Sequence, residues 1–327
     1  MQSQYRKLLL FIIIILYSIA VNAQNYYWVA FSNKAGTSYK LDEPQSFLSD
    51  RAIQRRSKQN IAIDSLDLPV NQSYINQITA LKATLVNQSK WLNGITVATD
   101  DSLFLDKAQA LPFVVQVQLT KPDMSKKKAK RKFLSQLTKL TTPIDTSMYG
   151  ESVHQVGQLN LQYLHSKNIK GKGMSIAIID AGFFKANAFK SLDSLWQNNQ
   201  ILGTHDFVQS NSDIFQQHQH GTSVLSCMGA YTEGVLIGTA PKASYWLLRS
   251  EDVSSEYLIE EDNWVAAAEF ADSVGVDIIN TSLGYNHFDD SLTNHTYAQM
   301  DGATTRITKA ADIAFKKGIL VFSSAGN

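Results

Sequence analysis

The sequence predicts two consecutive domains, a small α+β domain and then an α/β domain with a parallel sheet covered by helices on both faces. Between residues 26 and 119, strand-like and helical stretches follow the order strand, helix, strand, strand, helix, strand. From about residue 150 onward, apolar runs alternate with helical stretches, which is typical of strands buried on both faces. A basic, turn-prone segment separates the two patterns.

An apolar segment at the N-terminus indicates export. Arg6 and Lys7 precede the apolar run Leu8–Val21, and compact residues lead to Ala23. These features predict a signal peptide over residues 1–23 that is removed after Ala23. The alternative is a membrane anchor, but the run is shorter than the roughly 20 residues that a spanning helix needs. We therefore expect a periplasmic or extracellular protein without a membrane span after cleavage.

Residues 24–120 form the predicted small domain. Helical spacing of apolar residues is found over 46–58 and 73–83, and Ser73 can cap the second of these helices. A further helix follows Asp101, and the strands are expected in YYWVAF, ATLVNQSKW, LNGITVATD and PFVVQVQL. This order is the split βαβ, ferredoxin-like arrangement with an additional helix after the first strand.

Residues 121–149 are expected to be a basic linker. An exposed segment of this kind is also where proteolytic cleavage concentrates, so a processing region is a compatible interpretation. Its basic residues are Lys126, Lys127, Lys128, Lys130, Arg131 and Lys132.

Residues 150–327 form the predicted α/β domain. The last helix is expected to end at Lys317 with Gly318 as its C-cap. In parallel sheets, functional groups gather at the carboxyl ends of strands, so the residues that end each apolar run are the candidates for function. The runs are 174–180, 243–249, 276–283 and 319–325.

Three of the residues near these ends suggest acyl-transfer chemistry. Asp180 ends an apolar run, where a buried carboxylate must be paired or hydrogen-bonded. His220 precedes Gly221 and opens a helix, so its imidazole can face the carboxylate. Asn327 ends the segment SSAGN, where its amide can donate a hydrogen bond into a cleft. Acid, imidazole and amide donor are three of the four parts that a serine nucleophile needs.

Five sequence blocks in the same order resemble the subtilisin-like serine peptidases. The blocks are IAIIDAGF, HGTSVLS, IGTAP, INTSLGY and SSAGN, and the resemblance covers roughly residues 150–327. It implies that Asp180 is the triad acid, His220 the general base and Asn327 the oxyanion donor.

The same resemblance implies how substrate binds and what the first domain does. Ser282, Leu283 and Gly284 would pair with the substrate backbone and line the specificity pocket. The small domain would be an inhibitory, folding-assisting propeptide. The expected partners are therefore polypeptide substrates and the propeptide domain in cis. Calcium sites are common in that family, but the sequence has no unmistakable calcium-ligand loop, so no metal and no cofactor are assigned.

Two departures from the family pattern stand out. Ala181 replaces the usual Ser or Thr after the acid, which removes a hydrogen bond worth on the order of 1 kcal/mol. The family nucleophile lies in a GTS block well after the oxyanion Asn, whereas Gly221–Ser223 belongs to the histidine block. We therefore expect a fragment of a longer reading frame that lacks triad catalysis as it stands.

Composition and spacing disfavour several other classes. The chain has 327 residues with a formal net charge of +1, which argues against a nucleic-acid partner. The single cysteine, Cys227, cannot form an intramolecular disulfide, and its apolar helical surroundings predict a buried side chain. Gly171 and Gly173 precede a strand instead of following one, which is not the dinucleotide-binding pattern.

Two alternatives stay open. His218 and His220 could bind a metal with His205 or Asp206, although no HExxH motif is present. A subtilisin-like protein that has lost its catalytic residues and acts as a binding or structural protein is the other alternative. The stretch that follows Asn327 in the reading frame would separate that alternative from an enzyme.

Overall fold

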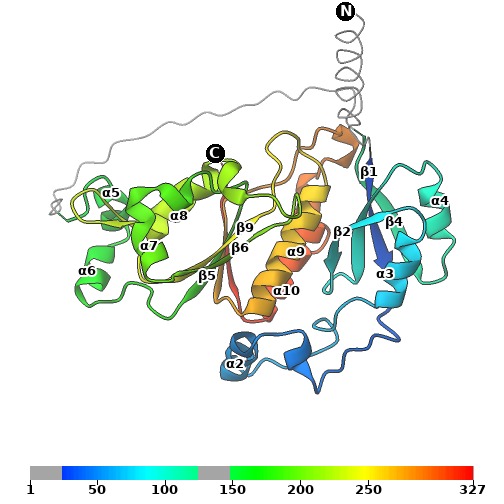
Figure 1. Cartoon of the computed structure of the whole chain (residues 1–327), viewed down its shortest axis with the longest axis horizontal. Coiled ribbons are helices and arrows are strands. Elements are labelled where there is room, and N and C mark those ends of the chain that lie inside the picture. Colours follow the sequence, from blue (N-terminus) through cyan, green and yellow to red (C-terminus); the bar gives the residue numbers. More distant parts are fainter. Residues whose placement is uncertain (1–23, 124–147, 327) are drawn as a thin grey trace, which may run out of the picture.

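The computed structural model describes residues 24–123 and 148–326 and contains two main sheets with a pair of helices between them (Figure 1). The predicted signal peptide, the basic cluster of residues 126–132 and Asn327 lie outside the described residues. Among the residues that the structure describes, no helix is long and apolar enough to cross a lipid bilayer.

The first domain is a four-stranded antiparallel sheet in the order β2-β3-β1-β4. Its core contains Val29, Ile78, Ile95 and Phe104, each with 0% exposure. The sheet order and the alternation of elements confirm the ferredoxin-like α+β prediction. The elements are β1 (Asn25–Phe31), α2 (Asp50–Gln59), α3 (Gln72–Thr79), β2 (Thr84–Ser89), β3 (Gly94–Thr99), α4 (Phe104–Gln109) and β4 (Val114–Lys121).

The second domain is built on a five-stranded parallel sheet in the order β11-β10-β5-β9-β6, which confirms the predicted α/β class. Its strands are β5 (Ser175–Asp180), β6 (Ile201–Asp206), β9 (Ser244–Arg249), β10 (Ile278–Thr281) and β11 (Leu320–Ser323). Its helices are α5 (Val153–Gln158), α6 (Leu161–Ser166), α7 (Asp193–Gln197), α8 (His220–Gly229), α9 (Ile259–Val274) and α10 (Arg306–Lys316). A short hairpin is formed by β7 (Tyr231–Thr232) and β8 (Leu236–Ile237).

Strand β5 has apolar side chains on both faces because helices cover both sides of the sheet. Ile176 and Ile178 pack in a core with α7 and α8, whereas Ala177 and Ile179 pack in a second core with α9 and α10. Side chains alternate between the faces of a strand, so a strand buried on both sides reads as an unbroken apolar run.

Several local features differ from the sequence prediction. Strand β6 was not predicted, because it is an edge strand whose Leu202 and Thr204 are exposed. Helix α3 is capped by Asn71 instead of Ser73: the Asn71 side chain accepts a hydrogen bond from the Ser73 backbone N–H at 2.8 Å. The expected burial of Cys227 is wrong, since this residue is exposed on α8.

Helix α9 joins the two domains. Glu269, 6% exposed, accepts hydrogen bonds from the backbone N–H groups of Lys90 and Trp91 at 2.7 and 3.0 Å. Asp262, 3% exposed, accepts from the hydroxyl of Thr96 at 3.1 Å. These polar side chains are buried without large cost because the first sheet supplies their hydrogen-bond donors.

A second contact between the domains is a buried ion-pair network beside α2. Arg56 donates to both carboxylate oxygens of Asp272, at 2.9 and 2.8 Å, and also to Asp67. Lys317 bonds to Asp67 at 2.9 Å, and Arg55 to Asp272 at 2.6 Å. The additional helix of the first domain therefore docks on the second domain through charged groups.

Candidate active site

Asp180 and His220 meet at the carboxyl end of the parallel sheet. Asp180 is the last residue of β5, and His220 is the first residue of α8. The His220 Nδ1 atom lies 2.8 Å from Asp180 Oδ1 and 3.1 Å from Asp180 Oδ2. Because a carboxylate can only accept hydrogen bonds, Nδ1 carries the proton and Nε2 is the basic nitrogen. This is the arrangement in which a histidine can act as a general base.

The surroundings of the pair keep the acid fixed and the imidazole accessible. The Asp180 side chain is 0% exposed and that of His220 is 34% exposed. Asp180 Oδ1 also accepts from the Ala181 backbone N–H at 2.7 Å, so the buried carboxylate is hydrogen-bonded although Ala181 has no hydroxyl. The pKa of His220 is raised by its hydrogen bond to Asp180, against the effect of burial, and further by the charges of Asp180 and Glu251.

Two glycines allow the ends of β5 and α8 to approach. The Gly221 N–H donates to the Gly182 carbonyl at 2.9 Å, and a Cβ at Gly221 would lie 2.5 Å from that oxygen. Gly182 has a φ of 146°, and a Cβ there would lie 2.5 Å from the backbone N of His218. The Thr222 hydroxyl donates to the Phe184 carbonyl at 2.9 Å and fixes the helix start on the loop. Both glycines therefore permit a close backbone contact beside Asp180 and His220 that a side chain would obstruct.

The segment expected to bind substrate follows β10. Leu283 and Gly284 line a cavity of about 530 Å³. Residues 323–326, which are the last residue of β11 and the three residues after it, line the same cavity. Ser282 is half-buried and is not among the lining residues. Because β10 and β11 are neighbouring parallel strands, the segments after them lie on the same edge of the sheet as Asp180. Asn327, the expected oxyanion donor, lies outside the described residues.

Asp206 and His205, which were considered as metal ligands, contact other side chains of the protein. Asp206 is bound by Arg249 at 2.9 Å and by Ser212. The His205 ring packs on Phe207 with a centroid distance of 4.3 Å. Within residues 24–123 and 148–326, no group of three or more His, Cys, Asp or Glu side chains is arranged to hold a metal ion.

Two further polar residues close to His220, His218 and Ser223, lie next to α8 and on it. His218 Nδ1 accepts a hydrogen bond from the His220 backbone N–H at 3.3 Å. Ser223 is exposed on α8 within one turn of His220.

One residue near the pair was missed by sequence reasoning. Glu251 follows β9, and its charge raises the pKa of His220. Burial, followed by the charge of Asp180, raises the pKa of Glu251 to about 7. The sequence could have indicated this residue, because Glu251 lies just beyond the apolar run 243–249, at another strand end.

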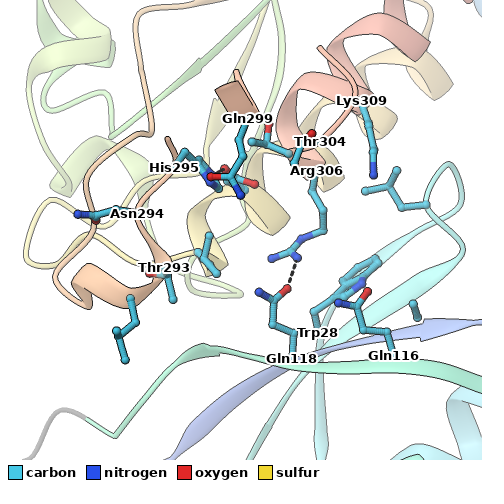
Figure 2. A pocket seen from close by; sticks show the side chains of 16 residues that line it. Trp28, Gln116, Gln118, Thr293, Asn294, His295, Gln299, Thr304, Arg306 and Lys309 are labelled. Atoms are coloured by element: carbon cyan, nitrogen blue, oxygen red, sulfur yellow. Dashed lines mark hydrogen bonds and ion pairs between the residues drawn. The ribbon is translucent and has the colours of Figure 1, made fainter. Parts of the chain in front are cut away.

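A second cavity lies between the domains, away from the pair. It measures about 510 Å³, and Figure 2 shows Trp28 and Gln118 of the first sheet facing Arg306 of α10 across it. Arg306 donates to the Gln118 side chain at 2.6 Å and lies over the Trp28 ring at 5.5 Å. These contacts assign the cavity to the domain boundary.

Comparison with protein families gives two matches to successive parts of the chain. Residues 26–135 match the peptidase S8 propeptide domain of Bacteroidota. Residues 171–327 match the subtilase family.

Several known bacterial proteins have sequences similar to this chain. Subtilisin E of Bacillus subtilis (strain 168) is 28% identical over 55% of this chain and 41% of that protein. A thermophilic serine proteinase of Bacillus sp. (strain AK1) is 27% identical over 57% of this chain and 41% of that protein. The chain thus spans less than half of the length of these relatives.

A solved structure shares the fold. The crystal structure of fervidolysin from Fervidobacterium pennivorans aligns with a TM-score of 0.53 and 16% identity. The alignment covers 93% of this chain and 40% of fervidolysin, so it includes both domains.

Proposed function

Because this chain belongs to the subtilase family of serine peptidases, we propose that it is the N-terminal part of an exported endopeptidase precursor that hydrolyses peptide bonds. The observation that carries the proposal is the 2.8 Å contact between Asp180 and His220 at the rim of the parallel sheet. The nucleophilic serine is proposed to lie in sequence after Asn327.

In the proposed reaction, His220 Nε2 takes the proton of the serine hydroxyl as the oxygen attacks the peptide carbonyl. Asp180 holds the Nδ1–H tautomer and stabilises the imidazolium that forms. The amide of Asn327 donates to the oxyanion of the tetrahedral intermediate. His220 then gives its proton to the leaving amine, and water hydrolyses the acyl-enzyme by the same steps.

Residues 24–120 are proposed to act as an inhibitory and folding-assisting propeptide. Their docking on α9 and α10 supports this role, as does the position of Lys121 at the end of β4. Lys121 Nζ lies 3.3 Å from Asp252, which follows Glu251 after β9. The end of the propeptide sheet is thus next to the segment that flanks the Asp180–His220 pair.

The proposal is tested by labelling the full-length, processed protein with a fluorophosphonate, which reacts with an activated serine. We expect labelling of the wild-type protein and strong loss of labelling in the variant His220→Ala. An unlabelled wild-type protein that is folded and processed would contradict the enzyme and favour a binding or structural role.

A further inference from the structure

Three carboxylates in the segment that links β9 to α9, and a fourth in the first turn of α9, lie near the proposed catalytic pair. They are Glu251, Asp252, Glu256 and Glu260 and are called the acidic cluster below. The residue before the cluster, Ser250, donates its backbone N–H to the carbonyl of Asp180 at 3.0 Å. The cluster therefore begins at the rim where Asp180 and His220 meet.

The other side of the cluster adjoins the segment expected to bind substrate. Tyr285 directly follows Gly284 and is 7% exposed. Burial raises the pKa of the Tyr285 hydroxyl well above its ordinary value, and the charges of Glu260, Glu251 and Glu256 raise it further. Leu258, which lies between Glu256 and Glu260 in sequence, packs with Tyr285 and Leu283. The acidic cluster thus lies between the proposed catalytic pair and the substrate-binding segment.

Three members of the cluster, Glu251, Glu256 and Glu260, have no ion pair among the described residues, whereas neighbouring carboxylates do. In the first turn of α9, Glu261 pairs with His295, and Asp262 pairs with Arg306 at 2.6 Å. Glu260 is 1% exposed, and its Oε1 accepts a hydrogen bond from the Asp252 backbone N–H at 3.3 Å. Its Oε2 atom is buried and has no hydrogen-bond partner among the described residues. A helix N-terminus favours acidic residues, but it does not explain a buried carboxylate oxygen that nothing satisfies.

Glu251 and Glu256 also lack a positively charged partner among the described residues. No lysine, arginine or histidine in the described ranges 24–123 and 148–326 forms an ion pair with Glu251 or Glu256. Burial, followed by the charge of Glu251, raises the pKa of Glu256 to about 8. A cation bound among these groups would relieve both the burial cost and the mutual repulsion.

The one ion pair that the cluster does form indicates the chemistry of the missing group. Lys121, at the end of β4, reaches Asp252 at 3.3 Å and lies 6.0 Å from the ring centre of Tyr257. This lysine comes from an extended edge strand of the other domain. The cluster therefore already receives an ammonium group from an extended peptide. A divalent cation fits less well, because the described carboxylates form no group of three arranged for metal binding.

We propose that Glu251, Asp252, Glu256 and Glu260 form a subsite that binds a lysine or arginine side chain of the polypeptide substrate. The inference rests on the proposed peptidase function and specifies its substrate class. Glu251, Asp252 and Glu256 are half-buried, so a long basic side chain would meet these three carboxylates first while the substrate backbone lies along the segment after β10. Cleavage after Lys121, within the proposed processing region 121–149, would remove this lysine together with the propeptide and leave the subsite open for substrate.

The test uses the full-length, processed enzyme and peptides that differ only at one position near the scissile bond. That position carries Lys, Arg, Gln, Leu or Glu, and each position is scanned in turn. At one position we expect kcat/KM for Lys or Arg to exceed that for Gln on the order of tenfold, as for one partly desolvated charge pair. The variants Glu251→Gln and Glu260→Gln should bring this ratio close to one.

The ratio of kcat/KM for basic and Gln peptides is also measured in a matched control variant, and the catalytic centre of every variant is checked separately. Asp312→Asn removes a carboxylate on the exposed face of α10, where it pairs with Lys316, and should keep the wild-type ratio. Fluorophosphonate labelling of each variant reports whether its centre is intact. A wild-type enzyme that cleaves peptides without preferring a basic residue at any position would overturn the subsite and leave the peptidase proposal standing. Failure to cleave any peptide, together with failure to label, would overturn both.

Discussion

The carboxylate of Asp180 determines which nitrogen of His220 is basic. It lies at the end of a strand whose side chains are all buried, and its two oxygens face His220 Nδ1. The hydrogen bond to the Ala181 backbone shows that the missing Ser or Thr hydroxyl is not needed to satisfy the acid. Orientation of the imidazole is thus the specific task that the site gives to Asp180.

The substitution Asp180→Asn tests this task. The side-chain amide that it introduces would favour the wrong tautomer of His220, so kcat of the full-length enzyme should fall on the order of 10⁴-fold. The measurement is steady-state hydrolysis of a peptide substrate, with circular dichroism to verify the fold. A fall of less than about tenfold in a folded variant would remove Asp180 from the mechanism.

Glu251 should contribute to the position of the acid limb of the pH profile, after the larger effect of Asp180 on His220. His220 is basic only when neutral, and the negative charge of Glu251 raises the pKa of His220. Glu251→Gln removes that charge, so the pKa of His220 falls and the acid limb of kcat/KM moves to lower pH. The measurement is the pH dependence of kcat/KM with a substrate that has no basic residue. An unchanged limb, or one that moves to higher pH, would be inconsistent with this coupling.

At the scale of the elements, the strand β5 and the helix α8 are joined by a close backbone contact. The N-terminus of α8 rests on the loop after β5 through the Gly221–Gly182 hydrogen bond. Neither glycine leaves room for a side chain, so the contact depends on both. The position of His220 relative to Asp180 is therefore a property of this junction.

Gly221→Ala should move the N-terminus of α8 away from the loop after β5. The added methyl group would lie 2.5 Å from the Gly182 carbonyl oxygen, so α8 must shift away from β5. A displacement of His220 by about 1 Å can cost about 100-fold in rate. Peptide hydrolysis measures the loss, and Ser223→Ala, at an exposed position on the same helix, is the control expected to keep its activity. Wild-type activity in Gly221→Ala would show that the junction tolerates a side chain.

Across the whole molecule, the two domains are held together by polar groups that each domain alone would leave unsatisfied. Glu269 and Asp262 of α9 receive their donors from the first sheet. Arg56, 1% exposed, is neutralised by Asp272 of the second domain and by Asp67 of its own domain. Such groups make the docked arrangement specific, because in an undocked domain they would lose their hydrogen-bond and ion-pair partners.

Arg56→Leu should destabilise the docked precursor. It leaves two buried carboxylates with fewer partners, although Asp272 keeps Arg55 and Asp67 keeps Lys317. We expect a loss of about 3 kcal/mol in the free energy of unfolding. Denaturant unfolding measures it on a precursor kept unprocessed by His220→Ala.

A surface ion pair provides the control for this experiment. Lys40 and Glu43 are 65% and 60% exposed, and Lys40→Ala should cost less than about 1 kcal/mol. Equal stability of Arg56→Leu and Lys40→Ala would mean that the buried network does not hold the domains together.

Sequence patterns alone predicted the two successive folds, most of their strands and helices, and the positions of Asp180 and His220 at the ends of such elements. These follow from local patterns: apolar runs mark buried strands, and their last residues must lie at one edge of a parallel sheet. The exposed edge strand β6 and the Asn71 cap escaped prediction because their local signals are weak or shared by several nearby residues.

The partners of the buried charged residues could not be predicted in this way. Nothing near Glu269 or Asp272 in sequence indicates that Lys90 or Arg56 lies beside them, and nothing near Glu260 indicates that one of its oxygens is left unsatisfied. The physical reason is that burial and pairing depend on which surfaces dock, and docking joins segments that are far apart along the chain. Local periodicity therefore fixes where the elements are, whereas long-range packing fixes which charges they share.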